Sequence, residues 1–413
     1  MNVAVFGCGY VGLTCAVGLA ELGHNVVGID IDSEKIKSLH EGTVPIYESG
    51  LQDMFKKHVE LGNLLFSEDG VRWLEYCDIA LCAVSAGEKT DFDAVKSVAE
   101  VFADAAKDET IFVIKSTVPV GSAEKIQEIV APKMVVANPE FLREGTALED
   151  FLHPQRVVVG LDGDDESVVS TMKKLYCYGD DVPFVFTNLR NAELIKYASN
   201  VFLATKISFA NELANLCEAT GADVQEVVRG MGFDLRIGSD FLQAGIGFGG
   251  SCLPKSVQTL LDDGAILECD LPLLEAVKRV NENRIERLLL RLEREIGSLA
   301  EKKIAVWGVT FKPNTNDVRE APALKVVEKL RQAQAQISAF DPVAPLEEME
   351  DMYAALEGAD ALLILTEWDA FKNPDYMRMK SLMKEPLVVD GRNVLDPQKM
   401  RAEGFRYLSV GRA

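Results

Sequence analysis

The first half of the chain alternates short apolar runs rich in valine and isoleucine with segments of helical periodicity. This pattern is typical of βαβ units around a parallel sheet. We predict six strands in it: Asn2–Phe6, Asn25–Asp30, Ile79–Val84, Thr110–Ile114, Met134–Ala137 and Arg156–Gly160. Their spacing predicts a doubly wound α/β domain.

The strand pattern stops between about Asn188 and Gly230. Residues 192–221 carry apolar side chains at helical spacing over roughly eight turns, too many for a crossover helix. A second helical stretch runs from Leu271 to Ile296 and ends in the charged segment RIERLLLRLEREIG. The long helix either is buried within its own monomer or forms part of a dimer, and we expect a homodimer through this central helix.

The α/β pattern returns from Lys302. We predict strands in KIAVWGV, QISAFD, DALLILT and LVVDGRN, a helix around Ala323–Gln332 and another helix between QISAFD and DALLILT. A chain of 413 residues exceeds what one hydrophobic core usually supports. The prediction is therefore α/β, with two Rossmann-like doubly wound domains (1–187 and 297–413) joined by a helical central region (188–296).

Composition narrows the class of protein. Hydrophobic residues make up 48% and charged residues 26%, as in ordinary globular proteins. The net charge of −22 argues against nucleic-acid binding, which needs a basic surface. The apolar N-terminal segment lacks the basic start of a signal peptide, and no uncharged apolar run of about 18 residues is present. We expect a cytoplasmic protein with no membrane partner.

Cysteine and histidine usage excludes several kinds of site. The eight cysteines form no CxxC pairs and have no flanking histidines, so neither a metal site nor a disulfide framework is indicated. Only four histidines occur, and none follows His153. A Ser-His-Asp catalytic device is therefore not expected.

A glycine pattern near the N-terminus predicts a dinucleotide site. GxGxxG follows the first predicted strand and opens a predicted helix, which is the context in which this pattern binds a pyrophosphate. The turn consists of Gly7, Cys8, Gly9, Tyr10, Val11 and Gly12. Asp30, at the end of the second strand, can bind both ribose hydroxyls and would repel the extra phosphate of NADP. We therefore expect NAD as the cofactor.

Four later blocks are similar to successive blocks of the UDP-glucose/GDP-mannose dehydrogenase family. They are KSTVPVG from Lys115, NPEFLREG from Asn138, GFGGSCLPK from Gly247 and FKPNTNDVREAP from Phe311. The likeness runs from residue 1 to about 396. It implies an NAD-dependent four-electron oxidation of UDP-glucose to UDP-glucuronate, with GDP-mannose or a UDP-N-acetylhexosamine as alternative substrates. It also implies an N-terminal NAD-binding domain and a C-terminal domain for the UDP-sugar.

The resemblance implies that Cys252 is the nucleophile, attacking the C6 aldehyde and later carrying a thioester. Without the family, a lone cysteine is more often a small core residue, although the glycine-rich surroundings and Lys255 favour a thiolate. The family places Lys196 and Asn200 at the reacting sugar carbon, where they stabilise an oxyanion. By themselves, such i, i+4 pairs are usually solvated surface.

The resemblance also gives roles to three further catalytic candidates. Glu144 assists hydrolysis or proton transfer, Glu140 supports the site around Lys196, and Thr117 orients a water. Without the family, the two glutamates read as surface acids at a helix start and the threonine as an ordinary turn hydroxyl.

Binding residues follow from the same match. Beyond the glycine turn and Asp30, the cofactor candidates are Lys35, Val84, Ser85, Ser116, Thr117, Glu144, Lys255 and Arg319. The candidates for the nucleotide sugar are Phe141, Leu142, Glu144, Lys196, Asn200, Arg236, Phe241, Phe248, Gly249, Lys255, Phe311, Lys312 and Arg392. In the family, the arginine that matches Arg236 reaches into the partner's active site. Arginine forks suit phosphate and carboxylate groups.

The chain departs from the family pattern at two places. Ser256 stands where the family usually has an aspartate, and a serine cannot accept a proton from water at neutral pH. This predicts slow thioester hydrolysis, and it leaves open a nucleotide-sugar-binding homologue with impaired turnover. Val84-Ser85-Ala86-Gly87 replaces a common Thr-Pro pair and is followed by a shortened loop, which predicts altered cofactor affinity.

Overall fold

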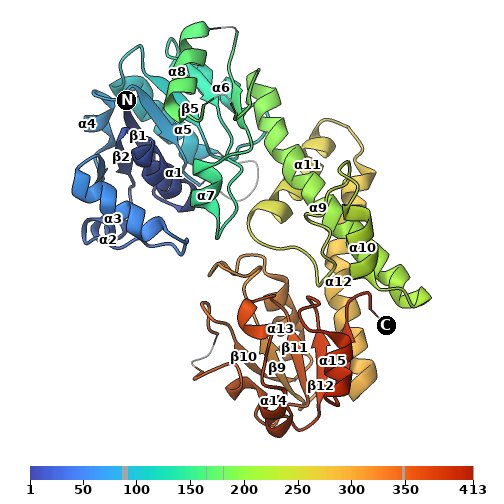
Figure 1. Ribbon diagram of the computed structural model, residues 1–413. Coiled ribbons are helices and arrows are strands. Elements are labelled where there is room, and N and C mark those ends of the chain that lie inside the picture. The colour runs from blue at the N-terminus through green and yellow to red at the C-terminus, as the bar shows by residue number, and fades with distance from the viewer. Residues whose placement is uncertain (86–91, 164, 180, 347–348, 413) are drawn as a thin grey trace. The chain divides into compact units, whose positions relative to one another are not determined.

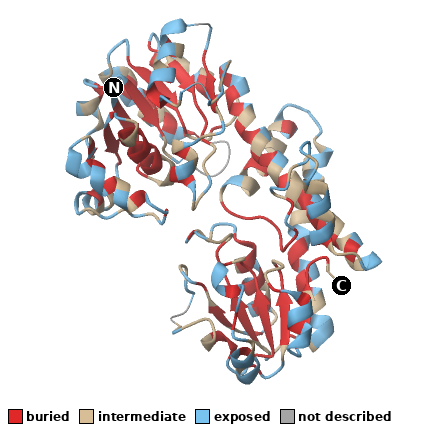
Figure 2. Cartoon of the chain, viewed as in Figure 1, coloured by how far each residue is buried: buried red, intermediate tan, exposed pale blue. Residues whose placement is uncertain are grey.

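The computed structural model describes every residue except 86–91, 164, 180, 347–348 and 413. The chain divides into two compact units, Met1–Ala198 and Ser199–Ala413. Each unit contains one largely parallel sheet with its own buried core, and the strands of both sheets are buried along most of their length (Figure 2). No helix among the described residues is both long enough and apolar enough to cross a membrane.

The first unit is built on an eight-stranded sheet of order β3-β2-β1-β4-β5-β6-β7-β8 (Figure 1). Its strands are β1 Asn2–Phe6, β2 Asn25–Ile29, β3 Leu64–Ser67, β4 Ile79–Cys82, β5 Ile111–Ile114, β6 Val135–Ala137, β7 Val157–Gly160 and β8 Phe184–Thr187. The doubly wound prediction is confirmed, and the six predicted strands are all present. Two edge strands, β3 and β8, were not predicted, and β6 pairs with β7 in antiparallel fashion.

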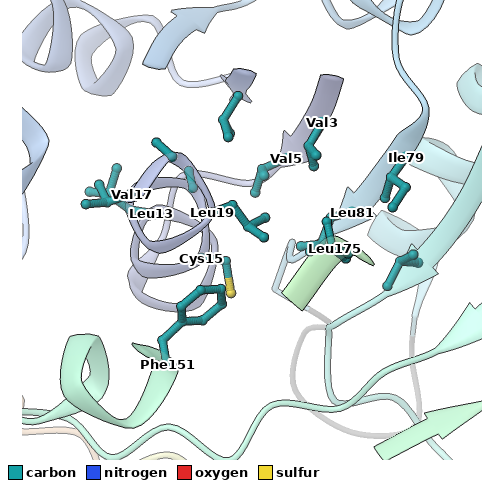
Figure 3. Close-up of a cluster of buried hydrophobic side chains, with 14 of the residues drawn as sticks. Val3, Val5, Leu13, Cys15, Val17, Leu19, Ile79, Leu81, Phe151 and Leu175 are labelled. Carbon is teal, nitrogen blue, oxygen red and sulfur yellow. The ribbon is translucent and has the colours of Figure 1, made fainter. Parts of the chain in front are cut away.

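Helices cover both faces of this sheet. They are α1 Tyr10–Glu21, α2 Ser33–His40, α3 Leu51–Leu61, α4 Gly70–Leu74, α5 Asp93–Ala105, α6 Ser122–Val130, α7 Ala147–Leu152 and α8 Glu166–Tyr176. On one face, side chains of α1 pack with those of β1, β4 and α8, together with Phe151 from α7 (Figure 3). This burial fixes the start of α1 at the carboxyl end of β1.

The predicted long helix is confirmed as α9, Leu189–Thr220, which has 32 residues. The division between the two units falls within it, after Ala198. Three further helices follow: α10 Val224–Gly232, α11 Cys252–Ile266 and α12 Pro272–Ile296. The last of them matches the predicted helix at 271–296 to within one residue.

The second sheet has five parallel strands in the order β10-β9-β11-β12-β13. They are β9 Lys303–Trp307, β10 Gln336–Phe340, β11 Ala361–Ile364, β12 Leu387–Asp390 and β13 Arg406–Ser409. The helices are α13 Pro322–Gln332, α14 Tyr376–Leu382, α15 Pro397–Ala402 and two 3₁₀ turns, Ala354–Leu356 and Asp369–Phe371. The smaller Rossmann-like domain is confirmed.

The prediction of an α-helix between β10 and β11 is wrong. The described residues of that connection form only the 3₁₀ turn Ala354–Leu356. Its residues Ala355 and Leu356 are fully buried in the cluster that includes strand residues of the second sheet, so one tight turn covers this part of the sheet.

Candidate active site

The glycine turn lies where the strand order of the first sheet reverses, between β1 and β4, the usual place for a ligand in such sheets. Gly7 has φ of 90° and its N–H donates to the carbonyl of Ile29 at 2.7 Å. A Cβ atom on Gly12 would lie 1.8 Å from the carbonyl oxygen of Gly7, whereas one on Gly9 would meet nothing within 4 Å. The turn therefore packs the helix tightly against the strand and leaves room for a pyrophosphate at Gly9. Tyr10 and Val11, the first residues of α1, are half-buried.

Asp30 lies directly beside this turn. Its carboxylate accepts hydrogen bonds from the N–H of Cys8 at 2.7 Å and of Asp32 at 3.0 Å, and it pairs with Lys35 Nζ at 2.7 Å. Burial alone would raise the pKa of Asp30, but Lys35 and the two amides outweigh it and lower the pKa. The carboxylate is thus held ionised at the edge of the turn. The next residue, Ile31, is 96% exposed, and sequence reasoning did not single it out.

Ser116 ties the end of β4 to the segment that follows β5. Its hydroxyl donates to the carbonyl of Val84 at 2.7 Å, and its N–H donates to the carbonyl of Cys82 at 3.0 Å. Val84 is half-buried and Ser85 is exposed. The departures predicted at residues 86 and 87 and in the shortened loop fall almost wholly on 86–91, outside the described residues.

The segment that follows β5 lines a small pocket. Its polar side chains include Thr117, Glu193 and Lys196, and Ser116 also contributes to the lining. The remaining lining residues are Ile114, Val118, Ala137, Pro139 and Tyr197. The structure therefore brings the predicted Thr117 and Lys196 to one pocket and adds Glu193, which the sequence reasoning missed.

Lys196 is buried in an ion pair. Its Nζ lies 2.8 Å from Oε1 of Glu140, and the other carboxylate oxygen accepts the N–H of Leu142 at 2.6 Å. Two cations lie close to the Phe141 ring, with Lys196 Nζ 5.4 Å and the Arg156 guanidinium carbon 3.8 Å from its centroid. Lys196 is therefore not the solvated surface residue that its spacing alone suggests.

Glu144 is half-buried in the loop before α7. The next residue, Gly145, donates its N–H to the hydroxyl of Tyr10 at 2.9 Å and to Glu48 at 2.8 Å, and Tyr10 itself donates to Glu48. Burial first, and then Glu48, raise the pKa of Tyr10. Glu48 thus ties this loop to the first residue of α1. It lies far away in sequence, and no motif marked it.

In the second unit, Cys252 is exposed and is the first residue of α11. We expected it within a glycine-rich loop, but it begins the helix directly after that loop. Lys255 follows within the first turn and is half-buried. Five other cysteines are buried. The thiol is therefore accessible at the first residue of a helix, an accessibility that a nucleophile needs.

Ser256 lies one helical turn after Cys252 and is buried. Its hydroxyl oxygen accepts a hydrogen bond at 3.0 Å from Nδ2 of Asn200, which is also buried. The serine that replaces the family's aspartate is therefore linked directly to a predicted catalytic amide.

The glycine-rich loop before α11 is packed on three sides. Asn281 accepts the N–H of Phe248 at 2.8 Å and donates to its carbonyl at 3.1 Å. Gly250 has φ of 76°, donates to the carbonyl of Arg319 at 3.1 Å, and has no room for a Cβ, which would lie 2.8 Å from the Phe311 ring. Gly249 is equally confined and buried. These contacts fix the approach of the chain to Cys252.

Arg392 holds the surrounding loops together. Its guanidinium donates to the carbonyls of Leu365 at 3.0 Å, Gly247 at 3.0 Å and Phe311 at 3.4 Å. We expected this arginine to contact the nucleotide sugar. Its geometry also makes it a clamp between the loops that follow β9 and β11 and the loop before α11. Lys312 Nζ lies 5.6 Å from the Phe311 ring centroid.

Two other predicted arginines are exposed and paired within their own loops. Arg319 forms an ion pair with Asp317 and Arg236 one with Asp234, each at 2.6 Å. Phe241, farther along the loop of Arg236, has a positive φ of 62°. No group of acidic, histidine or cysteine side chains suited to a metal ion occurs among the residues that the structure describes.

The predicted residues thus fall into two groups. The first unit holds the cofactor turn, Asp30, Lys35, Thr117, Lys196 and the 140–144 loop. The second holds Asn200, Cys252, Lys255, Ser256 and the loops around Phe311 and Arg392. The roles assigned to these residues stay predictions.

Comparisons with known proteins cover the whole chain. Three models of the UDP-glucose/GDP-mannose dehydrogenase family match it: the NAD binding domain at residues 1–179, the central domain at 190–283 and the UDP binding domain at 305–397. The chain is 42% identical to the UDP-glucose 6-dehydrogenase of Rhizobium meliloti, with full coverage of both chains.

Solved structures that are similar over the full length of this chain include the following two. A UDP-glucose dehydrogenase from Pyrobaculum islandicum is 36% identical with a TM-score of 0.91, and 98% of its chain is covered. A UDP-D-ManNAc dehydrogenase from Pyrococcus horikoshii is 28% identical with a TM-score of 0.90 and 99% covered. This chain is therefore an NAD-binding dehydrogenase that belongs to the UDP-glucose/GDP-mannose dehydrogenase family.

Proposed function

We propose that this enzyme oxidises UDP-glucose to UDP-glucuronate with two NAD per turnover. The observation that carries the proposal is the exposed thiol of Cys252 at the start of α11. The sugar is taken from the Rhizobium meliloti relative and the Pyrobaculum islandicum structure, whose printed names specify UDP-glucose. GDP-mannose and UDP-N-acetylhexosamines are the alternative substrates within the same reaction class.

Cys252 would turn the aldehyde stage into a thioester. In the first oxidation the C6 alcohol loses a proton and a hydride. The thiolate then forms a bond from sulfur to the aldehyde carbon, and this adduct loses the second hydride to give the thioester. Water attacks the thioester carbon and the carbon–sulfur bond breaks. The carboxylate product is released, the thiolate is regenerated, and the two protons of the water are lost to solvent.

Polar side chains would stabilise the charges that develop on the sugar oxygen. Lys196, held by Glu140, supplies an ammonium, and Asn200 supplies amide hydrogens. Thr117 would orient the water, and Glu144 would assist proton transfer. The ion pair with Glu140 keeps the Lys196 side chain in one position, which favours a fixed rather than a mobile donor.

The cofactor would lie over the glycine turn of the first unit. The open space at Gly9 and the ionised carboxylate of Asp30 suit the pyrophosphate and the ribose hydroxyls of NAD. When bound there, NAD supplies the hydride acceptor. Exposed Ile31, next to Asp30, offers an apolar surface for the adenine ring.

The nucleotide sugar would be held largely by the second unit. The loop after β9, with Phe311 and Lys312, lies where the order of the second sheet reverses, between β9 and β11. Lys255, Arg319 and Arg392 would provide positive charge for the diphosphate, while Phe141 and Leu142 from the first unit would also contact substrate.

A homodimer through α9 is part of the proposal. Phe202, Phe209 and Leu216 are spaced seven residues apart and are 65%, 47% and 59% exposed, so they form an apolar stripe on a helix. Arg236, whose side chain is 89% exposed, would reach the partner's site. Light scattering that gives the mass of a single chain would contradict this part.

A cytoplasmic location and the division into domains 1–187, 188–296 and 297–413 remain proposals as well. The three family models match residues 1–179, 190–283 and 305–397.

The deciding experiment offers the enzyme NAD with UDP-glucose, GDP-mannose and UDP-N-acetylhexosamines in parallel. Formation of NADH and the intact mass of the protein are followed together. We expect two NADH for each UDP-glucose consumed. Preference for another sugar would move the substrate assignment within the family, and no NADH with any of them would overturn the proposed reaction.

Ser256 gives a specific reason to test a second possibility, a homologue that binds the nucleotide sugar but hydrolyses the thioester slowly. Its buried hydroxyl is bonded to Asn200 and cannot accept a proton from water at neutral pH. Ser256→Asp should therefore increase steady-state turnover roughly several-fold, because the carboxylate can accept a proton from the attacking water. Ser256→Asn, of matched size but without a basic group, should not.

Mass spectrometry separates the two possibilities. If hydrolysis limits the natural enzyme, a burst of at most two NADH per site is accompanied by a covalent adduct on Cys252. The adduct should disappear in Ser256→Asp. An unchanged or lower turnover in that variant would count against the missing acid as the cause of slow hydrolysis.

A further inference from the structure

Glu193 is a buried carboxylate in the second turn of α9, and none of the proposed roles uses it. Its two oxygens accept the N–H of Gly121 at 2.5 Å and of Ala123 at 2.8 Å. Among the described residues, no side chain of α6 itself caps that helix, whose N-cap is Gly121 with φ of 89°. The carboxylate on α9 therefore caps α6 from a distance of 70 residues in sequence.

The capped end of α6 is also the end of the segment that carries Thr117. At its start, Ser116 is bonded to the carbonyls of Cys82 and Val84, at the carboxyl end of β4. At its end, Gly121 is bonded to Glu193. Thr117 thus lies on a short stretch of chain fastened at both sides, and the second fastening is the carboxylate.

Glu193 and Lys196 lie on the same helix and line the same pocket as Thr117. A displacement of the Thr117 segment would therefore alter its position relative to Lys196. Because small displacements of positioning groups reduce rates strongly, the fastening bears on the reaction and not only on the fold.

The environment of Glu193 also makes the fastening sensitive to pH. Burial raises the pKa of Glu193 to about 7, against the two amides, which lower it. Of the charged groups around it, Glu124 on α6 raises the pKa, Arg190 on α9 lowers it, and Lys196 faces the same pocket. Since the folded-state pKa is raised, this group's contribution to stability is lost as the pH rises through about 7. A gain in folding stability therefore does not explain why an ionisable carboxylate occupies this buried position.

We infer that Glu193 is a positioning residue, whose carboxylate holds the Thr117 segment and α6 in register with Lys196 for the dehydrogenase reaction. The inference rests on the proposed function for its kinetic consequence. The fastening itself can be measured without any substrate.

The test compares Glu193→Gln with the natural enzyme between pH 6 and 8.5. Glutamine preserves the shape but loses the charge and offers only one acceptor oxygen to the two amides. At pH 8 we expect kcat to fall roughly ten- to hundredfold with a much smaller change in the KM for NAD. The natural enzyme should lose kcat as the pH falls through about 7, and this decline should be absent from Glu193→Gln.

Two further variants serve as controls. Glu193→Asp keeps the charge on a shorter side chain. It should restore part of the kcat lost in Glu193→Gln, and its kcat should again fall as the pH is lowered. Glu124→Gln removes an exposed carboxylate that pairs with Arg190 at 2.6 Å. It should leave kcat at pH 8 unchanged and move the decline to lower pH, because Glu124 raises the pKa of Glu193.

Hydrogen exchange provides the readout that needs no sugar. At one fixed pH of 8, the amides of Gly121 and Ala123 should exchange faster in Glu193→Gln than in the natural enzyme, while those of β5 do not change. Equal exchange would overturn the fastening whatever the substrate is. Faster exchange with unchanged kcat and an unchanged pH profile would overturn the positioning role, and a natural enzyme inactive on all sugars would instead contradict the proposed function.

Discussion

The two sheets of this protein begin with the same turn but finish it differently. After β1, Gly7 has φ of 90° and donates its N–H to the end of β2 at 2.7 Å; after β9, Gly308 has φ of 88° and donates to the end of β10 at 2.8 Å. In each case the next residue donates its N–H to an acidic residue, Asp30 or Asp341, at 2.7 and 2.8 Å. The frame of a nucleotide-binding turn is therefore present twice.

The two carboxylates have different tasks. Asp30 is shared between two amides and Lys35 at the edge of an open turn. Asp341 is only 2% exposed. Among the described residues, its donors belong to its own and neighbouring loops: the N–H groups of Val309, Thr310, Val343 and Ala344, the hydroxyl of Thr310 and the indole N–H of Trp368. The first acid is placed to contact a ligand, and the second holds its loop.

The two turns also differ in where the next helix begins. In the first sheet α1 begins at Tyr10, directly after the glycine turn, so backbone N–H groups face an incoming phosphate. In the second sheet α13 does not begin until Pro322. The intervening loop carries Phe311, Lys312 and Arg319. Under the proposed function, the first turn would recognise its ligand with backbone N–H groups, whereas the second would do so with side chains.

The largest expected effect concerns the two acids. Asp341→Ala should lower the free energy of unfolding of the second unit by roughly 3 to 5 kcal/mol, because several buried donors lose their acceptor. That corresponds to a fall in Tm of about 10 °C, measurable by calorimetry. Asp30→Ala should cost less stability and mainly weaken NADH binding. Equal losses of Tm in the two variants would break the comparison.

A smaller effect is expected at the glycines. Gly9→Ala should leave Tm unchanged because its Cβ meets nothing within 4 Å, yet weaken NADH binding about a hundredfold by filling the space for the pyrophosphate. Fluorescence titration with NADH measures this.

Gly308→Ala is the matched control for Gly9→Ala. It introduces a Cβ 2.5 Å from the side chain of Thr366 and should lower Tm. NADH binding should not change. If Gly9→Ala bound NADH normally, the open space at Gly9 would not be the pyrophosphate site.

The sequence alone predicted what depends on local pattern. Strands such as β1 and β9 and the helices α9 and α12 follow from runs and periods of apolar residues, and the turn at Gly7 follows from its motif. The edge strands β3 and β8 have four residues each and are only partly buried, so their pattern is weak.

Contacts between distant residues were beyond the sequence. Glu48 and Glu193 act on amides 97 and 72 residues away, and Arg392 binds carbonyls, which have no side-chain signature. The antiparallel pairing of β6 with β7 likewise depends on how the chain returns to the sheet. Cys252 and Ser256 are four residues apart in one motif, so the sequence alone could place them close together. The hydrogen bond from Asn200 to Ser256 joins residues that are distant in sequence and is visible only in the fold.

The smallest effect concerns cofactor choice at the first turn. Asp30→Asn retains an acceptor for the N–H of Cys8 but removes the negative charge and releases Lys35 from its ion pair. The ammonium then becomes available to a 2′-phosphate, so the preference for NAD over NADP should decrease about tenfold, chiefly through tighter NADP binding. The ratio of kcat/KM for the two cofactors measures it.

Lys35→Ala in the Asp30→Asn background separates attraction from relieved repulsion. If Lys35 attracts the phosphate, the double variant should lose most of the gain in NADP affinity, and the gain should shrink with rising salt, since exposed charges are screened. A gain that survives both changes would mean that Asp30 acts by repulsion alone. In the part of the chain that the structure describes, the donors to Asp341 are backbone, hydroxyl and indole groups and none is a cation, so the second turn offers no comparable switch. The choice between NAD and NADP would then depend on Asp30, the acidic residue at the edge of the first turn.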